Sequence, residues 1–292
     1  MQGIILKGIG SFYYVLDDGG EVHQVRAQRK LRRDRLKPKV GDRVEITPGE
    51  GEENGWIHAI MPRRSELVRP PVANIDLVVI VASAAAPQPD LGMVDRLMIN
   101  ARRSAIEVQL VISKCDLDAG GAEAVVNQYR GAQAEPIRVS AVTGEGIDAL
   151  RDKLKGRVHA LAGQSGAGKS TLINALYGLE LETGDLSRRI DRGKNTTRSC
   201  ELIPVPGGGM VLDTPGFSLL ETEIFDPVEI KESYPEFVPY EGQCFFQPCY
   251  HASEPRCAVR DAVAEETIDA QRHGRYVEIL QDMRERWRNR YD

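Results

Sequence analysis

The segment Gly163-Gln164-Ser165-Gly166-Ala167-Gly168-Lys169-Ser170 fits the pattern G-x-x-x-x-G-K-[ST] and decides the interpretation of the chain. It follows the apolar run 158–162 and precedes the helical pattern that starts at Thr171, as such a loop requires. Glycines let the backbone N–H groups and the helix N-terminus face phosphate oxygens, while Lys169 reaches the β and γ phosphates and the Ser170 hydroxyl ligates magnesium. A ligand-free glycine turn would not need Lys and Ser at these places, so residues 163–171 are a predicted phosphate-binding loop.

A short apolar strand, residues 209–212, runs into Asp213-Thr214-Pro215-Gly216, which fits the D-x-x-G pattern of a second nucleotide switch. Asp213 would hold magnesium, and the Gly216 N–H would sense the γ-phosphate. The tetrapeptide is also good turn chemistry. Its position at a strand end, downstream of the phosphate loop, favours the switch.

The polar stretch 192–198 lies between these two motifs and shows no periodicity. It suits a first switch, in which a threonine hydroxyl completes the magnesium shell when the γ-phosphate is bound. We take Thr197 as that ligand, although Thr196 could equally serve. A solvated basic loop would look the same in isolation.

Upstream of the phosphate loop, the buried-strand pattern 108–112 ends in Ser113-Lys114-Cys115-Asp116, which resembles the N-K-x-D base-recognition motif. In that motif the Asp carboxylate accepts hydrogen bonds from guanine N1 and N2, the Lys stem covers the purine, and the Asn tethers the surrounding loops. Asp116 retains the pairing that adenine cannot satisfy. Ser113 replaces the Asn, which puts the strength of nucleotide binding in question rather than the preference for guanine.

A further strand leads into Ser140-Ala141, which opens a segment similar to S-A-x-x-G-x-G, whose backbone contacts guanine O6. The base-reading motifs therefore precede the phosphate loop, the reverse of the usual order. A doubly wound sheet tolerates such a circular permutation when its original termini lie close together. In this arrangement the chain after Gly216 is attached directly to the second switch.

Near the C-terminus, four side chains have the spacing C-x4-C-x-H-x5-C: Cys244, Cys249, His251 and Cys257. Three thiolates and one imidazole can surround a zinc ion tetrahedrally. Four protein ligands leave no open coordination position, so the sequence predicts one structural Zn²⁺.

The first segment has short apolar and aromatic runs separated by Asp-Gly, Pro-Gly and Asn-Gly turn signals, which suits an oligonucleotide-binding (OB) barrel. Residues 26–43 are strongly basic although the chain has a formal net charge of −5. A charge run is usually a solvated face, but on such a barrel it favours a phosphate-backbone partner. The candidate RNA-binding residues are Arg29, Lys30, Arg32, Arg33 and Arg35.

We therefore predict a multidomain chain: an all-β OB-fold barrel over 1–68, an α/β permuted P-loop GTPase domain over 69–222 and a mostly α zinc-binding module over 223–292. With 292 residues, 41% of them hydrophobic, the chain can bury a core of its own in the central domain. No apolar stretch approaches the length of a membrane span and no leader pattern opens the chain, so we expect a cytoplasmic protein without a membrane partner.

Barrel, permuted motifs and zinc spacing, in this order, closely resemble the circularly permuted, ribosome small subunit-dependent GTPases, the RsgA or YjeQ family. The resemblance covers nearly the whole chain. It implies a bacterial factor that binds the nearly mature small ribosomal subunit and its rRNA, checks or promotes folding of the decoding region, and leaves on GTP hydrolysis. It further implies GTP and GDP with Mg²⁺ as ligands, slow turnover that the subunit stimulates, and rRNA contacts through the barrel and the C-terminal module. We expect a monomer.

Two positions bear on catalysis. Asn195 stands where the family usually has a His within G-x-H-T-T; its amide can orient a water but cannot act as a general base near neutral pH. Phe217 follows the D-x-x-G segment where many GTPases carry a water-orienting Gln, which predicts low intrinsic turnover.

Three functions remain open on these residues. The leading one is a GTP-hydrolysing assembly factor. A P-loop ATPase or small-molecule kinase with an accessory barrel is the second, and Asp116 argues against it. The third is an RNA-binding module that holds GTP with little turnover.

Overall fold

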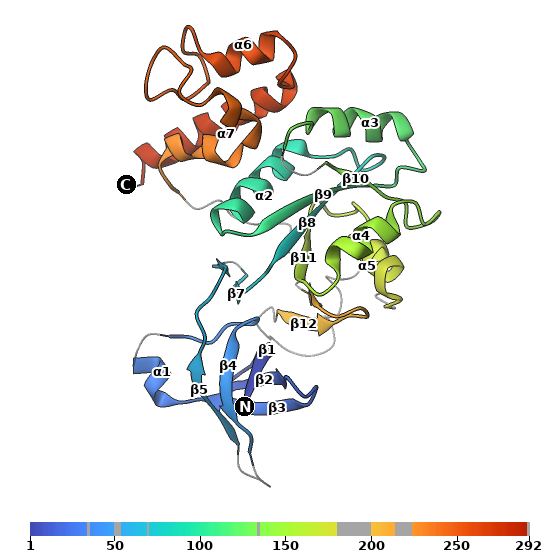
Figure 1. The fold of residues 1–292 in the computed structure, drawn as a ribbon, viewed down its shortest axis with the longest axis vertical. Coiled ribbons are helices and arrows are strands. Elements are labelled where there is room, and N and C mark those ends of the chain that lie inside the picture. Colours follow the sequence, from blue (N-terminus) through green and yellow to red (C-terminus); the bar gives the residue numbers. More distant parts are fainter. Residues whose placement is uncertain are drawn as a thin grey trace.

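In the computed structural model the protein is a column of three parts, with a barrel at one end, an α/β domain in the middle and a helical module at the other end (Figure 1). The structure describes residues 1–33, 36–49, 54–68, 70–132, 135–179, 200–213 and 224–290. Within these ranges, no helix has both the length and the apolar character needed to cross a bilayer.

The N-terminal part is a closed five-stranded barrel. Its strands run in the order β1-β2-β3-β5-β4, and β1 also pairs with β4, which closes the barrel. Alternate residues point inward, so Ile5, Val15 and Val44 are fully buried. The elements are β1 (Gln2–Ile9), β2 (Phe12–Asp17), β3 (Val22–Ala27), α1 (Arg29–Arg33), β4 (Arg43–Thr47) and β5 (Gly55–Ile60).

The central sheet has the order β10-β9-β8-β11-β13-β12, with every neighbouring pair parallel except β12–β13. Its strands are β8 (Leu77–Ser83), β9 (Glu107–Ser113), β10 (Ile137–Arg138), β11 (Val158–Ala162), β12 (Glu201–Pro204) and β13 (Met210–Asp213). The helices are α2 (Leu91–Arg103), α3 (Ala119–Gln128), α4 (Ile147–Leu154) and α5 (Lys169–Tyr177).

Both faces of this sheet are covered by helices. Successive side chains of β8 point to opposite faces: Val78 and Ile80 pack in the core with α2 and α3, while Leu77 and Val79 pack in the core with α4 and α5. All seven residues of β8 are buried, as expected for a central parallel strand. Because β8 leads to α2 on one face and β11 leads to α5 on the other, their carboxyl ends form a switch point, where doubly wound folds bind ligands.

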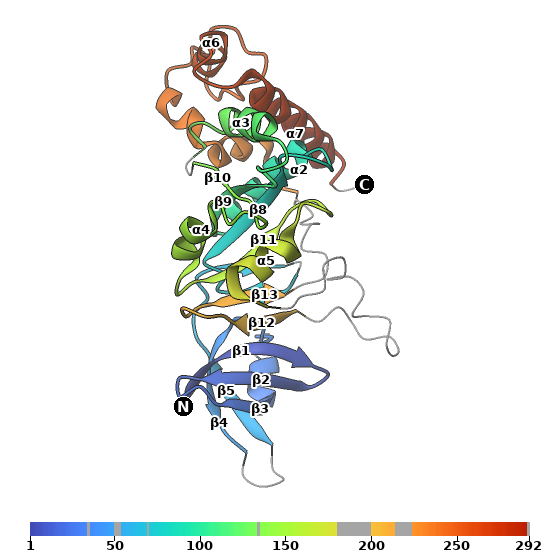
Figure 2. The same ribbon diagram turned by 90° about the vertical axis from the view of Figure 1, so that its right-hand side faces the viewer.

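The barrel is joined to the central sheet by strand pairing. β1 pairs antiparallel with β12, where Lys7 lies opposite Glu201, so the two sheets are continuous (Figure 2). Leu6 reaches the core of the central domain beside Leu202. The connection between the two parts forms a small hairpin, β6 (Glu66–Leu67) and β7 (Val72–Ala73), and Val40 of the barrel bridges to Val72.

The C-terminal module contains two 3₁₀ segments, η1 (Pro227–Ser233) and η2 (Pro235–Tyr240), and two helices, α6 (Ala258–Ala264) and α7 (Ala270–Arg288). It packs against α2 of the central domain, whose Ile99 belongs to the module's core. Figure 1 shows α7 lying beside α2.

Carboxylate caps set where two of the helices begin. α2 begins at Leu91, because the Asp90 carboxylate caps it through the Met93 N–H. α7 begins at Ala270, because the chain turns at Glu266, which has a φ of 58°, and Asp269 caps the helix through the Arg272 N–H.

Candidate nucleotide and metal sites

The phosphate-binding loop leaves β11 and enters α5 at the carboxyl edge of the sheet. Gly163 has a φ of 132°, and a Cβ built there would lie 2.2 Å from the Val81 carbonyl oxygen, so only glycine fits. Gly168 is the N-cap of α5, has a left-handed φ of 89° and provides no side-chain cap. The first N–H groups of α5 therefore lack both intrahelical and capping partners, which is the arrangement that binds an anion.

Lys169 curls back over this loop. Its Nζ donates to the carbonyl oxygens of Gly163 at 2.7 Å and Gln164 at 2.8 Å. Burial lowers the pKa of Lys169 from its ordinary value. A phosphate beside Lys169 would oppose that shift, because a nearby negative charge favours the ammonium form. The glycine backbone, the open helix N-terminus and the lysine thus fit a polyphosphate.

The base-recognition motif lies directly against the phosphate loop. The Ser113 hydroxyl contacts the carbonyl oxygens of Ala167 at 2.6 Å and Ala82 at 3.2 Å. Lys114 has a left-handed φ of 58°, and its Nζ donates to the Gly166 carbonyl oxygen at 2.8 Å. A short hydroxyl at position 113 thus makes a tether between the two loops, and Asp116 is left exposed beside them.

The Ser140-Ala141 segment completes this edge. The Val139 N–H donates to Ile112, and the Cys115 N–H donates to Val139, which places the segment beside the base-recognition motif. The buried Ser140 hydroxyl accepts from the Val142 and Thr143 N–H groups at 3.3 and 3.1 Å and shapes a tight turn. Burial is the main cause that raises the pKa of the Cys115 thiol, so this thiol is a neutral packing group.

The loop 83–90 also lies against the phosphate loop and the base-recognition motif. The Ala86 carbonyl oxygen accepts from Lys114 Nζ at 2.6 Å, and the Asp90 N–H donates to Gln164 Oε1 at 3.1 Å. Pro87 lies 3.3 Å from where a Cβ of Gly166 would be. On the side of the loop these contacts use backbone groups and a proline ring, so no catalytic residue type marked the loop in the sequence.

Asp213 ends β13, whose partner β11 delivers the phosphate loop. Leu212 pairs with Ala160, so the carboxylate lies at the edge from which that loop departs. The remaining switch residues named from the sequence lie outside the described residues: Asn195, Thr196, Thr197, Gly216 and Phe217.

These segments together offer a place for a purine and for a polyphosphate. The N-terminus of α5 and Lys169 lie at one end of this edge, and Asp116 and the Ser140 turn lie at the other, where the sequence predicts the phosphates and the base. Ser170 on the first turn of α5 and Asp213 at the end of β13 offer the hydroxyl and carboxylate oxygens that Mg²⁺ prefers.

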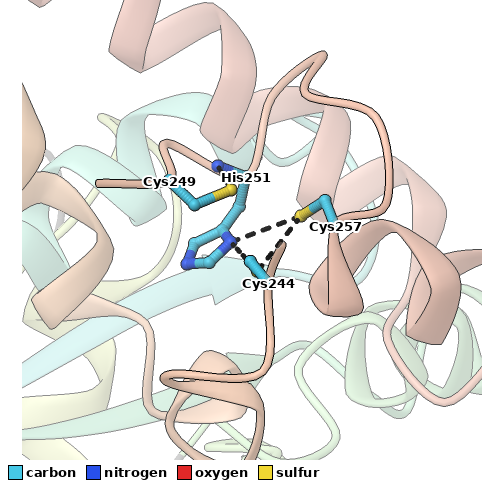
Figure 3. A group of neighbouring side chains, drawn as sticks. All are labelled: Cys244, Cys249, His251 and Cys257. Carbon is cyan, nitrogen blue, oxygen red and sulfur yellow. Dashed lines mark hydrogen bonds between the residues drawn. The ribbon is translucent and has the colours of Figure 1, made fainter. Parts of the chain in front are cut away.

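The four cysteine and histidine side chains of the C-terminal module converge on one point (Figure 3). Cys244 Sγ lies 3.8 Å from Cys257 Sγ and 3.5 Å from His251 Nδ1, which lies 3.4 Å from Cys257 Sγ. Tetrahedral zinc with ordinary bond lengths separates two sulfurs by about 3.8 Å and a sulfur from a nitrogen by about 3.6 Å. The spacing therefore fits zinc.

All four side chains are buried, which suits a structural metal. Burial raises the pKa of the Cys249 thiol to about 12, so this thiol stays protonated unless a cation is bound. His273 Nε2 donates to the His251 carbonyl oxygen at 2.7 Å, and Tyr276 OH donates to the Tyr250 carbonyl oxygen at 2.5 Å, so α7 supports the loop from behind.

A buried ion network, which sequence reasoning missed, joins α2 to α7. The Asp95 carboxylate accepts from Arg272 at 2.5 Å, from Arg275 at 2.6 Å and from Tyr129 OH at 2.7 Å. Arg272 also bonds Glu236. Burial alone would lower the pKa of Arg272, but the carboxylates of Asp95 and Glu236 raise it above its ordinary value.

The basic stretch of the barrel, residues 26–43, includes α1 and the segments on either side of this helix. Arg29 and Lys30 are exposed on this helix, as an RNA-binding surface requires. Arg35 lies outside the described residues, as do the side chains of Arg32 and Arg33.

Comparison with protein families gives two adjoining matches. Residues 2–57 match the RsgA N-terminal domain, and residues 60–223 match the RsgA GTPase. The chain is 40% identical over 293 residues to the small ribosomal subunit biogenesis GTPase RsgA of Caldanaerobacter subterraneus, with 100% of this chain and 98% of that protein covered. Its identity to the protein of the same name from Geobacillus thermodenitrificans is 43%, with 98% of each chain covered.

Two solved structures share the whole architecture. The crystal structure of YjeQ from Thermotoga maritima superposes with a TM-score of 0.84 at 34% identity, covering 97% of this chain and 98% of that one. YloQ, a circularly permuted GTPase, gives a TM-score of 0.79 at 29% identity and covers 98% of this chain and 95% of its own.

Proposed function

The chain belongs to the RsgA GTPase family, and on that premise we propose that it is a GTP-hydrolysing factor in the biogenesis of the small ribosomal subunit. Its relatives carry that function in their names, and the similarity extends over the full chain. The observation that carries the proposal is that the base-recognition motif is hydrogen-bonded to the phosphate loop. Ser113 bonds the Ala167 carbonyl oxygen, and Lys114 bonds the Gly166 carbonyl oxygen. These bonds support a single site that holds the base and the phosphates of one nucleotide.

The nucleotide would be held by groups at two ends of this site. The Asp116 carboxylate accepts from guanine N1 and N2, and the stem of Lys114 covers the purine. At the other end, the N–H groups of the phosphate loop and Lys169 bind the β and γ phosphates. Mg²⁺, when bound to Ser170, Asp213 and a switch threonine, Thr197 or Thr196, neutralises phosphate charge.

Hydrolysis requires a positioned water. Asn195 would orient it through the side-chain amide, and the Gly216 N–H would sense the γ-phosphate. Asn at 195 and Phe at 217 provide neither a general base nor a water-orienting Gln at these two positions, so we propose slow turnover alone and faster turnover on the subunit, with release after hydrolysis.

The barrel and the C-terminal module would face ribosomal RNA. Arg29 and Lys30, with Arg32, Arg33 and Arg35, provide the positive charge on the barrel, and Cys244, Cys249, His251 and Cys257 would hold the structural Zn²⁺. We propose domain boundaries after residues 68 and 222, a monomer, and action in the cytoplasm, where ribosomal subunits mature.

A second candidate function is an RNA-binding GTP switch with little turnover, which Asn195 and Phe217 favour. An ATPase or kinase is disfavoured by Asp116, which pairs with guanine and not with adenine.

The test is phosphate release from GTP and from ATP, each with and without purified small ribosomal subunits. The proposal predicts stimulation only with GTP and subunits together, and Lys169→Ala should abolish it. Tight GTP binding without stimulation would favour the switch, whereas equal ATP turnover would overturn the nucleotide assignment.

A further inference from the structure

Two adjacent phenylalanines project from the zinc loop into solvent. Phe245 is 59% exposed and Phe246 is 48% exposed, although Cys244 and Cys249 on either side are buried. The two rings contact each other edge to face, with centroids 4.9 Å apart and an interplanar angle of 81°. Large aromatic side chains exposed together commonly mark an interaction site.

These rings are held in place rather than loosely displayed. The Phe245 N–H donates to the Arg256 carbonyl oxygen at 3.1 Å, and the Arg256 guanidinium lies 3.8 Å from the Phe245 ring centroid. The loop is fixed at its two ends by Cys244 and Cys249, two of the four zinc-site residues. Such fixed rings lose little conformational freedom when a partner binds.

The charge around the rings is positive. Arg256 and Arg260 are exposed, and Arg284 of α7 stacks on the Tyr250 ring at 4.0 Å. The Glu254 carboxylate accepts from backbone N–H groups of the same loop, at 3.1 Å from Tyr250, 2.9 Å from Ala252 and 3.0 Å from Ser253. The Glu241 carboxylate pairs with Lys231. Arg256 therefore borders the Phe245 ring, Arg260 and Arg284 lie on the two helices of the same module, and the Glu254 and Glu241 carboxylates are engaged in contacts of their own.

We propose that Phe245, Phe246 and Arg256 form a platform on which unpaired bases of single-stranded RNA stack, with Arg260 and Arg284 facing the phosphates. Aromatic rings and guanidinium planes stack bases of any sequence, and bases are open to such stacking where they are not paired. The choice of RNA as the partner rests on the proposed function, but binding of a short oligonucleotide without the ribosomal subunit tests the platform separately. The alternative partner is an apolar protein surface.

The experiment uses the full-length, zinc-loaded protein and a fluorescein-labelled single-stranded oligoadenylate of about ten nucleotides. The double variant Phe245→Leu/Phe246→Leu keeps the apolar surface but removes the π faces. We expect its affinity for the oligonucleotide to fall about tenfold or more, since each stacked base contributes strongly. Phe245→Tyr/Phe246→Tyr should bind within about twofold of the parent, because the rings remain.

Controls separate stacking from damage to the loop. Val238→Ala removes another exposed apolar side chain of the same module, 62% exposed, and should leave binding unchanged. The zinc content per chain of each variant should equal that of the parent. If the double variant loses zinc, the single variant Phe246→Leu provides the test, with a smaller expected loss of affinity for the oligonucleotide. The parent should prefer the single strand to the same sequence paired with oligouridylate.

If the Leu double variant binds the oligonucleotide as tightly as the parent, the stacking platform is refuted and an apolar protein partner is favoured. Equal binding of single strand and duplex by the parent would also refute the platform. Subunit-stimulated GTP hydrolysis by the parent is measured separately. Its absence would refute the proposed function while leaving ring-dependent oligonucleotide binding intact.

Discussion

Asp95→Asn should detach the C-terminal module from α2. The Asp95 side chain is fully buried and bonds Arg272, which is 3% exposed, whereas the nearby Arg96–Asp282 pair on the same two helices is 38% and 42% exposed. Asparagine keeps the shape of the side chain but removes its negative charge. Its amide also replaces one carboxylate oxygen, which accepts hydrogen bonds, with an NH₂ group, which donates them and so faces the donors of the arginines. Arg272 and Arg275 then remain in the interior without this counter-charge.

The expected loss follows from burial. Removing one partner of a buried ion pair costs about 3–5 kcal/mol, whereas an exposed pair contributes about 0–1 kcal/mol. The chain has two tryptophans, Trp56 in the barrel and Trp287 on α7, so in a Trp56→Phe background the fluorescence of Trp287 reports the module alone. In urea, Asp95→Asn should lower the unfolding midpoint of zinc-loaded protein by at least about 1 M.

Asp282→Asn is the matched control, since it makes the same chemical change in the exposed pair. Its midpoint should stay close to that of the parent. Equal shifts for Asp95→Asn and Asp282→Asn would refute the argument that the buried network holds the module to α2. Retained GTP binding in both variants would show that the central domain is folded.

Three further changes test the other sites. Asp116→Asn should reduce discrimination between GTP and ATP about tenfold or more in competition binding, because a charged hydrogen-bond acceptor is lost; unchanged selectivity would reject the base-reading role. Cys249→Ser should release zinc and disorder the C-terminal module while GTP binding persists; metal analysis showing full retention would contradict the ligand set. Burial lowers the pKa of His159, whose ring bonds Tyr177 OH at 2.8 Å, below its ordinary 6.5. As the pH falls below 6.5, the unfolded chain therefore takes up a proton at this position more readily than the folded chain, and stability falls. His159→Gln should show a smaller drop in melting temperature between about pH 7.5 and 5.5 than the parent. Equal drops would show that His159 does not contribute.

The phosphate loop and the zinc cluster could be named from sequence because local constraints dictate their residue types. Gly163 must be glycine, since a Cβ would meet the Val81 carbonyl oxygen at 2.2 Å. The zinc ligands need particular side chains within a short stretch, and spacing alone identifies them. The family resemblance, which the comparisons confirm, supplied what no local pattern carries: the ribosomal partner.

Contacts between distant segments could not be predicted in this way. Asp95 and Arg272 are 177 residues apart, and neither neighbourhood indicates the other. The signal available was an acidic residue within the otherwise apolar stripe of α2, which a buried partner would explain. The role of the loop 83–90 was equally hidden, because Ala86 acts through its carbonyl oxygen, a group that every residue has.

These two missed features meet at α2, because the loop 83–90 ends at its N-cap residue Asp90 and Asp95 lies in its first turns. At its start, the Asp90 N–H is bonded to Gln164 of the phosphate loop; at its end, Arg102 donates to the Ser233 carbonyl oxygen and Arg103 pairs with Glu229. A helix of 13 residues is about 20 Å long and moves as a stiff body. The buried charges of Asp95 and Arg272 separate only at a cost of several kcal/mol, so we expect the C-terminal module to move with α2. Through its N-cap residue Asp90 and through Asp95, α2 thus connects the phosphate loop to the C-terminal module by direct contacts.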